Sequence, residues 1–396
     1  MVRAGYGFFY TPYTGQFLAG LLNGNGLTQT SITVSPYQTT APLFPRVLTF
    51  PGSAGSANLM YPDSKLRDPH NAVASLAIER RIAAYTTVTL TIVNSHATKL
   101  WTGLDSNLTV PVKTVTYPID NASGAAAGSY TTAMYTNKND GKYAHIYTVG
   151  NGGSATYNAA SLEVRRQMRH GLGVQASYAW SRDTGTNTGP LAGGTFPLTS
   201  TPVDTTTDKG LLPTDRRQRA VVNWTWQPTL THDDSWMARY LINGWQLSGI
   251  ASVATGQPVT PTVLLSGNQF STLTMAYYNT LNGSGGWARV PFENIGSLTT
   301  DSQRSLDFRL GRTIPFSERV QGAVAFEAYN LFNMQRITAV NTPGYIGVTT
   351  LPPGVVNGPY SAVLKPVSGV GTGISSATFP DGTSARRLQL SLRVVF

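Results

Sequence analysis

Apolar and polar residues alternate with a period of two along much of the chain, which is the pattern of β-strands with one apolar and one polar face. The C-terminal eleven residues show it most clearly. Their length is close to the roughly 9–11 residues that a membrane-spanning strand needs. The segment is consistent with the last strand of a soluble β-sandwich, but it favours a strand whose apolar face is covered by lipid. The residues on that apolar face are Leu388, Leu390, Leu392, Val394 and Phe396.

Similar segments recur along the chain, and the connections between them alternate between short turns and long polar stretches. We expect about ten strands, at 2–10, 74–81, 86–98, 157–168, 172–182, 218–227, 244–255, 303–313, 320–330 and 386–396. The long stretches are 11–71, 99–155, 183–214, 256–302 and 331–385. Structureless loops beyond about 12–15 residues are uncommon in soluble domains. The alternation of short and long connections predicts an all-β fold. The expected structure is part of an antiparallel transmembrane β-barrel with long extracellular loops and short periplasmic turns.

Composition agrees with this class. Only 12% of the 396 residues are charged, about half the usual quarter of a soluble protein. Apolar runs stay well below the roughly 18–20 residues of a transmembrane helix. The chain has no cysteine, which excludes disulfides, thiolate zinc sites and a cysteine nucleophile.

The net charge of +10 raises the question of nucleic acid as a partner. The basic residues do not form runs, and the densest groups are pairs within or beside strand-like segments, such as Arg165-Arg166 and Arg216-Arg217. We therefore expect no nucleic-acid partner. Arginines that line a barrel lumen or face lipopolysaccharide phosphates explain the charge better.

Two sets of side chains on the strands are candidate functional residues. Charged residues on the polar faces of the strands predict a surface that lines the barrel lumen. Such residues either contact a plug or a passing substrate, or form cross-strand ion pairs. We favour cross-strand ion pairing. They are Glu79, Glu163, Arg165, Asp307, Arg309, Glu327 and Arg393. Aromatic residues on the apolar faces are typical of an interfacial girdle, which we favour over cofactor or sugar platforms. They are Tyr178, Trp180, Trp224, Trp226 and Trp245.

Motifs of enzymes and cofactor sites are missing from the sequence. The five histidines are not spaced as metal ligands, and His232-Asp233-Asp234 fits a polar turn. Neither a Gly-x-Ser-x-Gly elbow nor a phosphate-binding glycine loop occurs. We expect no catalytic residue, no metal and no cofactor.

Eight short motifs, in order along nearly the whole chain, carry a family resemblance. They are Arg3–Tyr10, Asp68-Pro69 with Leu76–Arg80, Tyr157–Ala159 with Leu162–Arg166, Ser177–Ser181, Asp215–Arg219 with Asn223-Trp224, Gly244–Gly249 with Gly256–Pro258, Phe326–Asn333, and the terminal strand. The chain resembles the C-terminal barrel portion of TonB-dependent outer-membrane receptors, most closely the Oar-like branch.

The resemblance implies a plugged barrel of about 22 strands, of which residues 1–396 supply roughly the last ten. The family's signal peptide, N-terminal regulatory-like domain, TonB box and plug have no counterpart here, and the first residues read as a strand rather than a signal peptide. We therefore expect a chain that begins within a larger protein.

The expected function is outer-membrane transport of a large or scarce ligand, in the bacterial cell outer membrane. The alternatives are a stand-alone barrel that serves as a passive pore or adhesin, and a soluble secreted protein that binds carbohydrate. The expected partners are outer-membrane lipid and lipopolysaccharide, the TonB complex through the missing N-terminal region, and the barrel assembly machinery. The resemblance implies that this machinery reads the terminal strand, which ends in Phe396.

Overall fold

The structure is a computed structural model. It describes residues 1–25, 57–135, 137–186, 191–192, 196–233, 235–266, 280–316, 320–349, 362–376 and 385–396. None of the helices in these ranges is long and apolar enough to cross a membrane.

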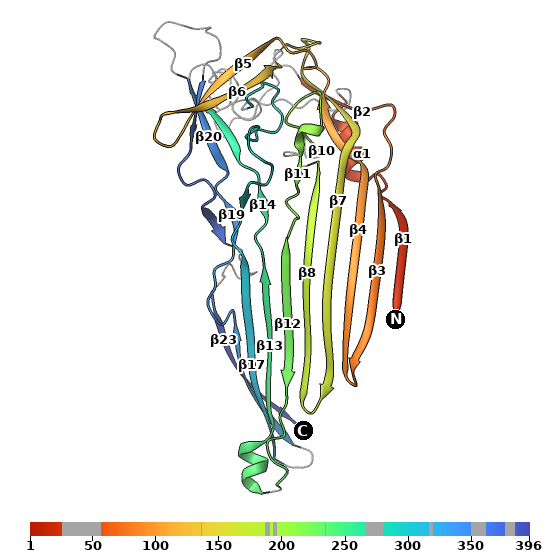
Figure 1. Cartoon of the computed structure of the whole chain (residues 1–396), viewed down its shortest axis with the longest axis vertical. Coiled ribbons are helices and arrows are strands. Elements are labelled where there is room, and N and C mark those ends of the chain that lie inside the picture. Colours follow the sequence, from red (N-terminus) through yellow and green to blue (C-terminus); the bar gives the residue numbers. More distant parts are fainter. Residues whose placement is uncertain are drawn as a thin grey trace, which may run out of the picture.

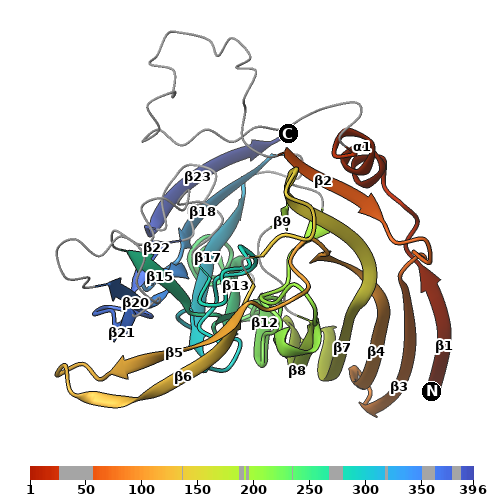
Figure 2. The same ribbon diagram turned by 90° about the horizontal axis from the view of Figure 1, so that it is seen from above.

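A twelve-stranded sheet dominates the structure, and ten of its strands follow one another in sequence order, each antiparallel to the next. We call these ten strands the wall. Seen from above, the wall is curved into an open trough (Figure 2). Its strands are β1 (Val2–Tyr10), β3 (His70–Ala83), β4 (Thr86–Asp105), β7 (Tyr143–Arg169), β8 (Leu172–Thr186), β12 (Gln218–Trp226), β13 (Trp245–Ala254), β17 (Gln303–Pro315), β18 (Gln321–Tyr329) and β23 (Arg387–Val395).

The wall is not a closed barrel. Within the described residues, β1 pairs only with β3 and β23 pairs only with β18, so each outer strand has one unpaired edge. The other two strands of the sheet are short: β2 (Ala57–Pro62) is parallel to β7, and β11 (Lys209–Leu211) is antiparallel to β8.

All short connections lie at one end of the wall, which is the lower end in Figure 1. Between β7 and β8, Arg169 pairs with Leu172, so the turn consists of two residues, His170 and Gly171. Their φ angles of 51° and 72° are those of a type I′ turn, whose twist matches a hairpin. The connection from β12 to β13 has about the length that the expected strands 218–227 and 244–255 leave, and it contains the π-helix η2 (Ala238–Ile242). Between β17 and β18, residues 317–319 lie outside the described residues.

The long connections meet at the opposite end and fold there (Figure 1). Three of them build a five-stranded sheet, which with the residues packed on it we call the cap; its strands are β15 (Thr262–Ser266), β20 (Pro343–Thr349), β21 (Ala362–Pro366), β5 (Lys113–Asp120) and β6 (Ala126–Met134). The smaller elements are α1 (Gly15–Asn23), β9 (Leu191–Ala192), β10 (Phe196–Pro197), η1 (Thr206–Asp208), β14 (Pro258–Val259), β16 (Leu298–Thr299), β19 (Ile337–Val340) and β22 (Gly373–Ser376).

Buried apolar clusters lie in the long connections. The cap has a core of nine buried residues: Val115, Tyr117, Met134, Val263, Leu265, Leu281, Val290, Ala362 and Leu364. A second cluster joins α1 to the upper parts of β2 and β7; its buried members are Phe17, Met60, Tyr147, Val149 and Leu198. Phe17 stacks on Trp101 there, with ring centroids 4.1 Å apart.

Two expectations from the sequence need correction. The long connections are not structureless, because each contains ordered elements; in Lys113–Asp120, Val115, Tyr117 and Ile119 alternate with polar residues and Pro118, a strand signal that the count of ten left out. The described chain holds 23 strands rather than about ten. The sequence count covers only the wall, because short cap strands gain their stability from partners far away in the sequence.

Candidate functional site: the two faces of the wall

Strand register divides the wall into two faces. Residues paired in an antiparallel ladder point to the same side of the sheet, and alternate residues of a strand share that side. One row across five strands is Arg165, Gln175, Asn223, Ile250 and Asp307. Rows two residues above and below are also mostly polar, so one face, which we call the polar face, runs across all ten strands.

All seven charged residues singled out in the sequence lie on the polar face: Glu79, Glu163, Arg165, Asp307, Arg309, Glu327 and Arg393. Several of them bond across strands. The Nε of Arg309 lies 3.3 Å from Oε1 of Glu327, and Nη2 of Arg3 lies 2.6 Å from Oε2 of Glu79. Such half-exposed pairs stabilise a sheet only weakly. Whether the face also contacts a plug or a substrate stays a prediction.

Two acidic side chains on the polar face accept hydrogen bonds from neutral donors. Gln175 donates from Nε2 to Glu163 over 2.8 Å. The main-chain N–H of Asn330 donates to Asp307, also over 2.8 Å, and ties the start of the long connection after β18 to the wall. These contacts add to the ladder hydrogen bonds on the polar face.

The opposite face, which we call the apolar face, is exposed along its length. Leu390 and Leu392 are each 76% exposed, although a leucine in a soluble sheet is normally buried. The other exposed residues on this face come from most of the wall strands and include Val2, Tyr6, Phe8, Leu76, Ile78, Leu90, Ile92, Leu162, Val253, Val324, Phe326, Leu388 and Val394. An exposed apolar surface of this extent needs a partner that is itself apolar.

The five predicted girdle aromatics lie on the apolar face, in two groups. Tyr178 and Trp180 are nearer the end of the wall that carries the cap. Nearer the opposite end, where the short turns lie and which we call the turn end, are Trp224, Trp226 and Trp245. Trp226 pairs with Leu172, eight residues before Trp180 on β8. At 3.3 Å per residue Trp226 and Trp180 are therefore roughly 26 Å apart along the strands, whereas Tyr178 and Trp224 are four residues apart in register. The interfacial girdle therefore stays a prediction for these aromatics.

The turn-end group has a basic neighbour. The guanidinium of Arg312 lies 4.8 Å from the centroid of the Trp245 ring, and the Trp245 Nε1–H donates to the Leu241 carbonyl over 3.3 Å. This tryptophan lies at the end of a strand, beside an arginine, and its ring N–H has a hydrogen-bond acceptor. Such an arrangement is typical of a membrane–water boundary.

Two hollows lie mainly against the polar face. The first, of about 390 Å³, is lined by Asp307, Arg309, Glu327 and Tyr329 among others. The hydroxyl of Tyr329 donates to Glu327 over 3.3 Å. The second, of about 330 Å³, lies at the cap end of the wall and is lined by several arginines. Both hollows thus lie on the side of the wall that carries the cross-strand ion pairs.

A family comparison decides the class of the protein. The family model of the outer membrane beta barrel domain matches residues 1–351. The chain belongs to this family. The barrel domain is thus a protein of the bacterial outer membrane, and its exposed apolar face is the kind of surface that lipid covers. No curated protein matches the sequence.

Solved structures similar to the barrel domain are receptors and transporters. The outer-membrane transporter YddB from Escherichia coli is 12% identical, with a TM-score of 0.46, over all of this chain and 38% of that chain. The siderophore receptor PirA from Acinetobacter baumannii is 14% identical, with a TM-score of 0.41, over 85% of this chain and 35% of that chain. The ferripyoverdine receptor of Pseudomonas aeruginosa is 10% identical, with a TM-score of 0.40, over 83% of this chain and 27% of that chain. The barrel domain spans less than two fifths of these proteins.

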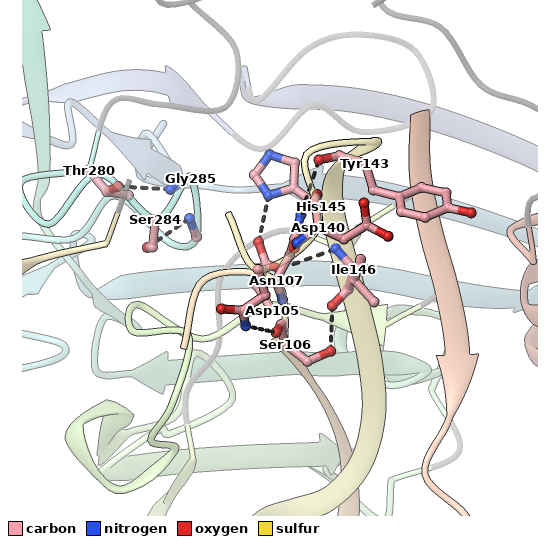
Figure 3. Close-up of polar contacts among 12 residues, drawn as sticks. Asp105, Ser106, Asn107, Asp140, Tyr143, His145, Ile146, Thr280, Ser284 and Gly285 are labelled. Carbon is pink, nitrogen blue, oxygen red and sulfur yellow. Dashed lines mark hydrogen bonds and ion pairs between the residues drawn. The ribbon is translucent and has the colours of Figure 1, made fainter. Parts of the chain in front are cut away.

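Sequence reasoning missed a buried polar cluster beside the cap, shown in Figure 3. Nδ1 of His145 lies 2.6 Å from Oδ2 of Asp105, and both side chains are buried. The other carboxylate oxygen of Asp105 accepts the main-chain N–H groups of Asn107 and Ile146. The cluster therefore joins the end of β4 to the start of β7. Asp105 and His145 are 40 residues apart, so no local motif reveals the pair.

A second buried ion pair joins two of the long connections. Nε of Arg289 lies 2.9 Å from Oδ1 of Asp208, and a further nitrogen of the same guanidinium donates to the Thr207 carbonyl over 2.7 Å. Asp208 also accepts the hydroxyl of Ser200. Breaking such a pair costs much more than it contributes, because the remaining charge stays buried. In the described part of the chain no group of three or more His, Asp or Glu side chains is placed to hold a metal ion.

Proposed function

We propose that the barrel domain is part of the wall of a TonB-dependent receptor of the Oar-like branch, which moves a large or scarce ligand across the outer membrane. In this proposal residues 1–396 are the C-terminal portion of the receptor. The observation that carries it is the combination of a continuous polar face with two outer strands that, among the described residues, are each paired on one side only. An unpaired strand edge within lipid leaves main-chain N–H and C=O groups without partners, so each edge requires a partner strand, which in this proposal the rest of a larger barrel supplies.

The polar face supports transport rather than adhesion alone. It continues from the short-turn end to the cap end of the wall and carries both hollows. The cap lies at the end where the long connections meet, which is the extracellular end of such barrels. A folded cap over a polar trough supplies an entrance that screens solutes.

The stand-alone pore is the runner-up. It requires β1 and β23 to pair with each other, so that the wall closes on itself. The soluble carbohydrate-binding alternative is disfavoured by the family membership and by the exposed apolar face.

Disulfide cross-linking distinguishes the receptor from the stand-alone pore. The sequence has no cysteine, so only the introduced cysteines can form disulfides. Ala4→Cys is combined in turn with Leu388→Cys, Leu390→Cys and Leu392→Cys, all on the apolar face, in cells that carry the chain in the outer membrane. The positive control is Ala4→Cys with Leu76→Cys, because these residues are paired across β1 and β3 and such pairs are within disulfide reach.

We expect the control pair to form an intrachain disulfide and the β1–β23 pairs to remain reduced. Intrachain β1–β23 disulfides, together with ion conductance in planar bilayers, would show a closed pore and contradict the proposal. A disulfide-linked dimer would contradict it as well, because a second copy would then supply the missing strands.

A further inference from the structure

The connection from β12 to β13 exposes large apolar side chains outside the wall. Its helical segment comprises residues 236–242 and includes η2. Trp236 is 66% exposed, Met237 57% and Leu241 50%, whereas Ala238 is buried. Met237 and Leu241 are four positions apart, so they share one side of the segment. Isolated apolar residues on a surface are ordinary, but three large ones within one short segment form a patch. We call Trp236, Met237 and Leu241 the anchor patch.

Hydrogen bonds give this connection a defined conformation. The side-chain oxygen of Asn243 accepts the main-chain N–H of Leu230 over 2.9 Å, and its amide nitrogen donates to the Thr231 carbonyl over 2.8 Å. At the start of the segment, the Ser235 hydroxyl accepts the main-chain N–H of Ala238 over 3.2 Å. The exposure of the anchor patch is therefore a property of a folded connection.

The segment lies on the side of the apolar face. Trp245 and Arg312 are paired, and both have the strand parity of that face. The ring N–H of Trp245 donates to the Leu241 carbonyl over 3.3 Å, which brings the main chain of the segment to the same side.

The next connection at the turn end places an aromatic ring on this side too. A Cβ on Gly322 would lie 2.6 Å from Cε2 of Phe316, and Gly322 is paired with Val394 of the apolar face. Phe316 is itself exposed. The apolar face thus continues past the ends of the strands into two connections.

This continuity identifies what covers the anchor patch. The barrel domain belongs to the outer membrane, and its apolar face is a surface that lipid covers. The surroundings of Trp245 are typical of a membrane–water boundary. Residues 236–242 lie directly before Trp245 in the chain, so they are at the depth where acyl chains meet headgroups.

The composition of the segment fits this depth. Arg239 is exposed among the apolar residues, and its guanidinium lies 5.7 Å from the centroid of the Tyr240 ring. A short helical segment with tryptophan, methionine and leucine exposed beside an arginine has the amphipathic character of elements that lie in the membrane interface.

We infer that residues 236–242 are an interfacial anchor, whose patch inserts among the acyl chains of phospholipid in the leaflet at the turn end. In the predicted orientation this is the periplasmic leaflet. The anchor fixes the depth at which β12 and β13 lie in the membrane. It holds for a receptor and for a closed pore alike, because the segment lies outside the wall.

The test places nitroxide labels on the full chain, reconstituted in vesicles of phosphatidylethanolamine and phosphatidylglycerol. Met237→Cys and Leu241→Cys report on the anchor patch. Leu390→Cys, on the apolar face of the wall, is the lipid control, and His232→Cys, at an exposed polar position of the same connection, is the water control. Electron paramagnetic resonance compares collisions with oxygen, which concentrates among acyl chains, and with a nickel chelate, which stays in water.

We expect oxygen collisions to dominate at both patch positions, as at Leu390→Cys, and nickel collisions to dominate at His232→Cys. Nickel collisions at the patch as frequent as at His232→Cys would show that water covers it and would overturn the inference. Low collision rates with both reagents would overturn it as well, because a protein surface, such as a second copy or the rest of a receptor, would then cover the patch.

A second measurement needs no label. Trp236→Phe removes one of the seven tryptophans, so the fluorescence that this variant loses is that of Trp236. Phospholipid brominated near the headgroup end of its acyl chains should quench that difference more strongly than phospholipid brominated near the chain ends. A difference that neither lipid quenches, or that the second lipid quenches more, would contradict an interfacial position.

Discussion

Leucine side chains are exposed in the wall and buried in the cap. Leu390 lies in a wall strand and is 76% exposed, whereas Leu364 lies in a cap strand and is fully buried. Both belong to antiparallel ladders with ordinary register. The cap is stabilised as a soluble domain is, by apolar side chains removed from water and packed on each other. The wall presents its apolar side chains outward, so the stability of the wall depends on lipid.

The largest effect is expected from one substitution made in both regions. Leu364→Ala removes a fully buried side chain from the cap core and should cost about 2–5 kcal/mol, through lost burial and a residual cavity. Limited proteolysis of the outer-membrane protein should then cut the cap readily, while heat-modifiable migration of the wall persists. Leu390→Ala is the matched control and should leave the cap resistant. Equal protease sensitivity in the two variants would show that the cap has no independent core.

A smaller effect is expected from charge placed on each face of the terminal strand. Leu392→Asp puts a carboxylate on the apolar face, where a basic residue costs about 2–4 kcal/mol near the midplane and an acidic one less. Ser391→Asp adds the same charge on the polar face and should be milder. The measurement is the yield of heat-modifiable protein in the outer membrane, with Phe396 deletion as a third variant that tests the assembly signal. Equal yields for all three would refute the assignment of the faces and the signal.

The smallest effect is expected from the ion pair between Arg309 and Glu327. Glu327→Gln removes the charge but keeps an acceptor, and an exposed pair contributes only about 0–1 kcal/mol. The thermal midpoint of the wall in detergent should therefore shift little. A large drop would mean that the polar face is held together by its charges. The cap, which has buried charge at Arg289 and Asp208, offers the contrast: Asp208→Asn should destabilise it far more.

The alternation of residues predicted the wall well, because each wall strand carries its own signal. Thr86–Asp105 begins with a regular alternation of threonine and apolar residues, and His170-Gly171 marks a turn that needs two positive φ angles. A Cβ at Gly171 would lie 2.0 Å from the Gln227 carbonyl oxygen, so glycine is required there for a second reason that only the structure reveals.

The faces of the candidate site were also predictable, since parity along a strand fixes which side chains share a side. The contacts on those faces were not. Arg309 meets Glu327 only because β17 and β18 pair in one particular register. The hollows require the curvature of the sheet, and the arginines of the second hollow come from three separate segments. The buried pair of Asp105 and His145 depends on the pairing of β4 with β7 beyond the strand limits that alternation indicates.

The topology of the cap sets an order of events during biogenesis. In the cap sheet β5 lies beside β21, although Ile119 and Leu364 are far apart in sequence, and β15 lies parallel to β20. Such non-local pairings form slowly, because loop closure comes before any contact is gained. The cap core around Val115 and Tyr117 therefore stays incomplete until residues 362–366 have reached it. Completion of the cap thus requires the last long connection to be in place, and an assembly intermediate that lacks it leaves these side chains exposed.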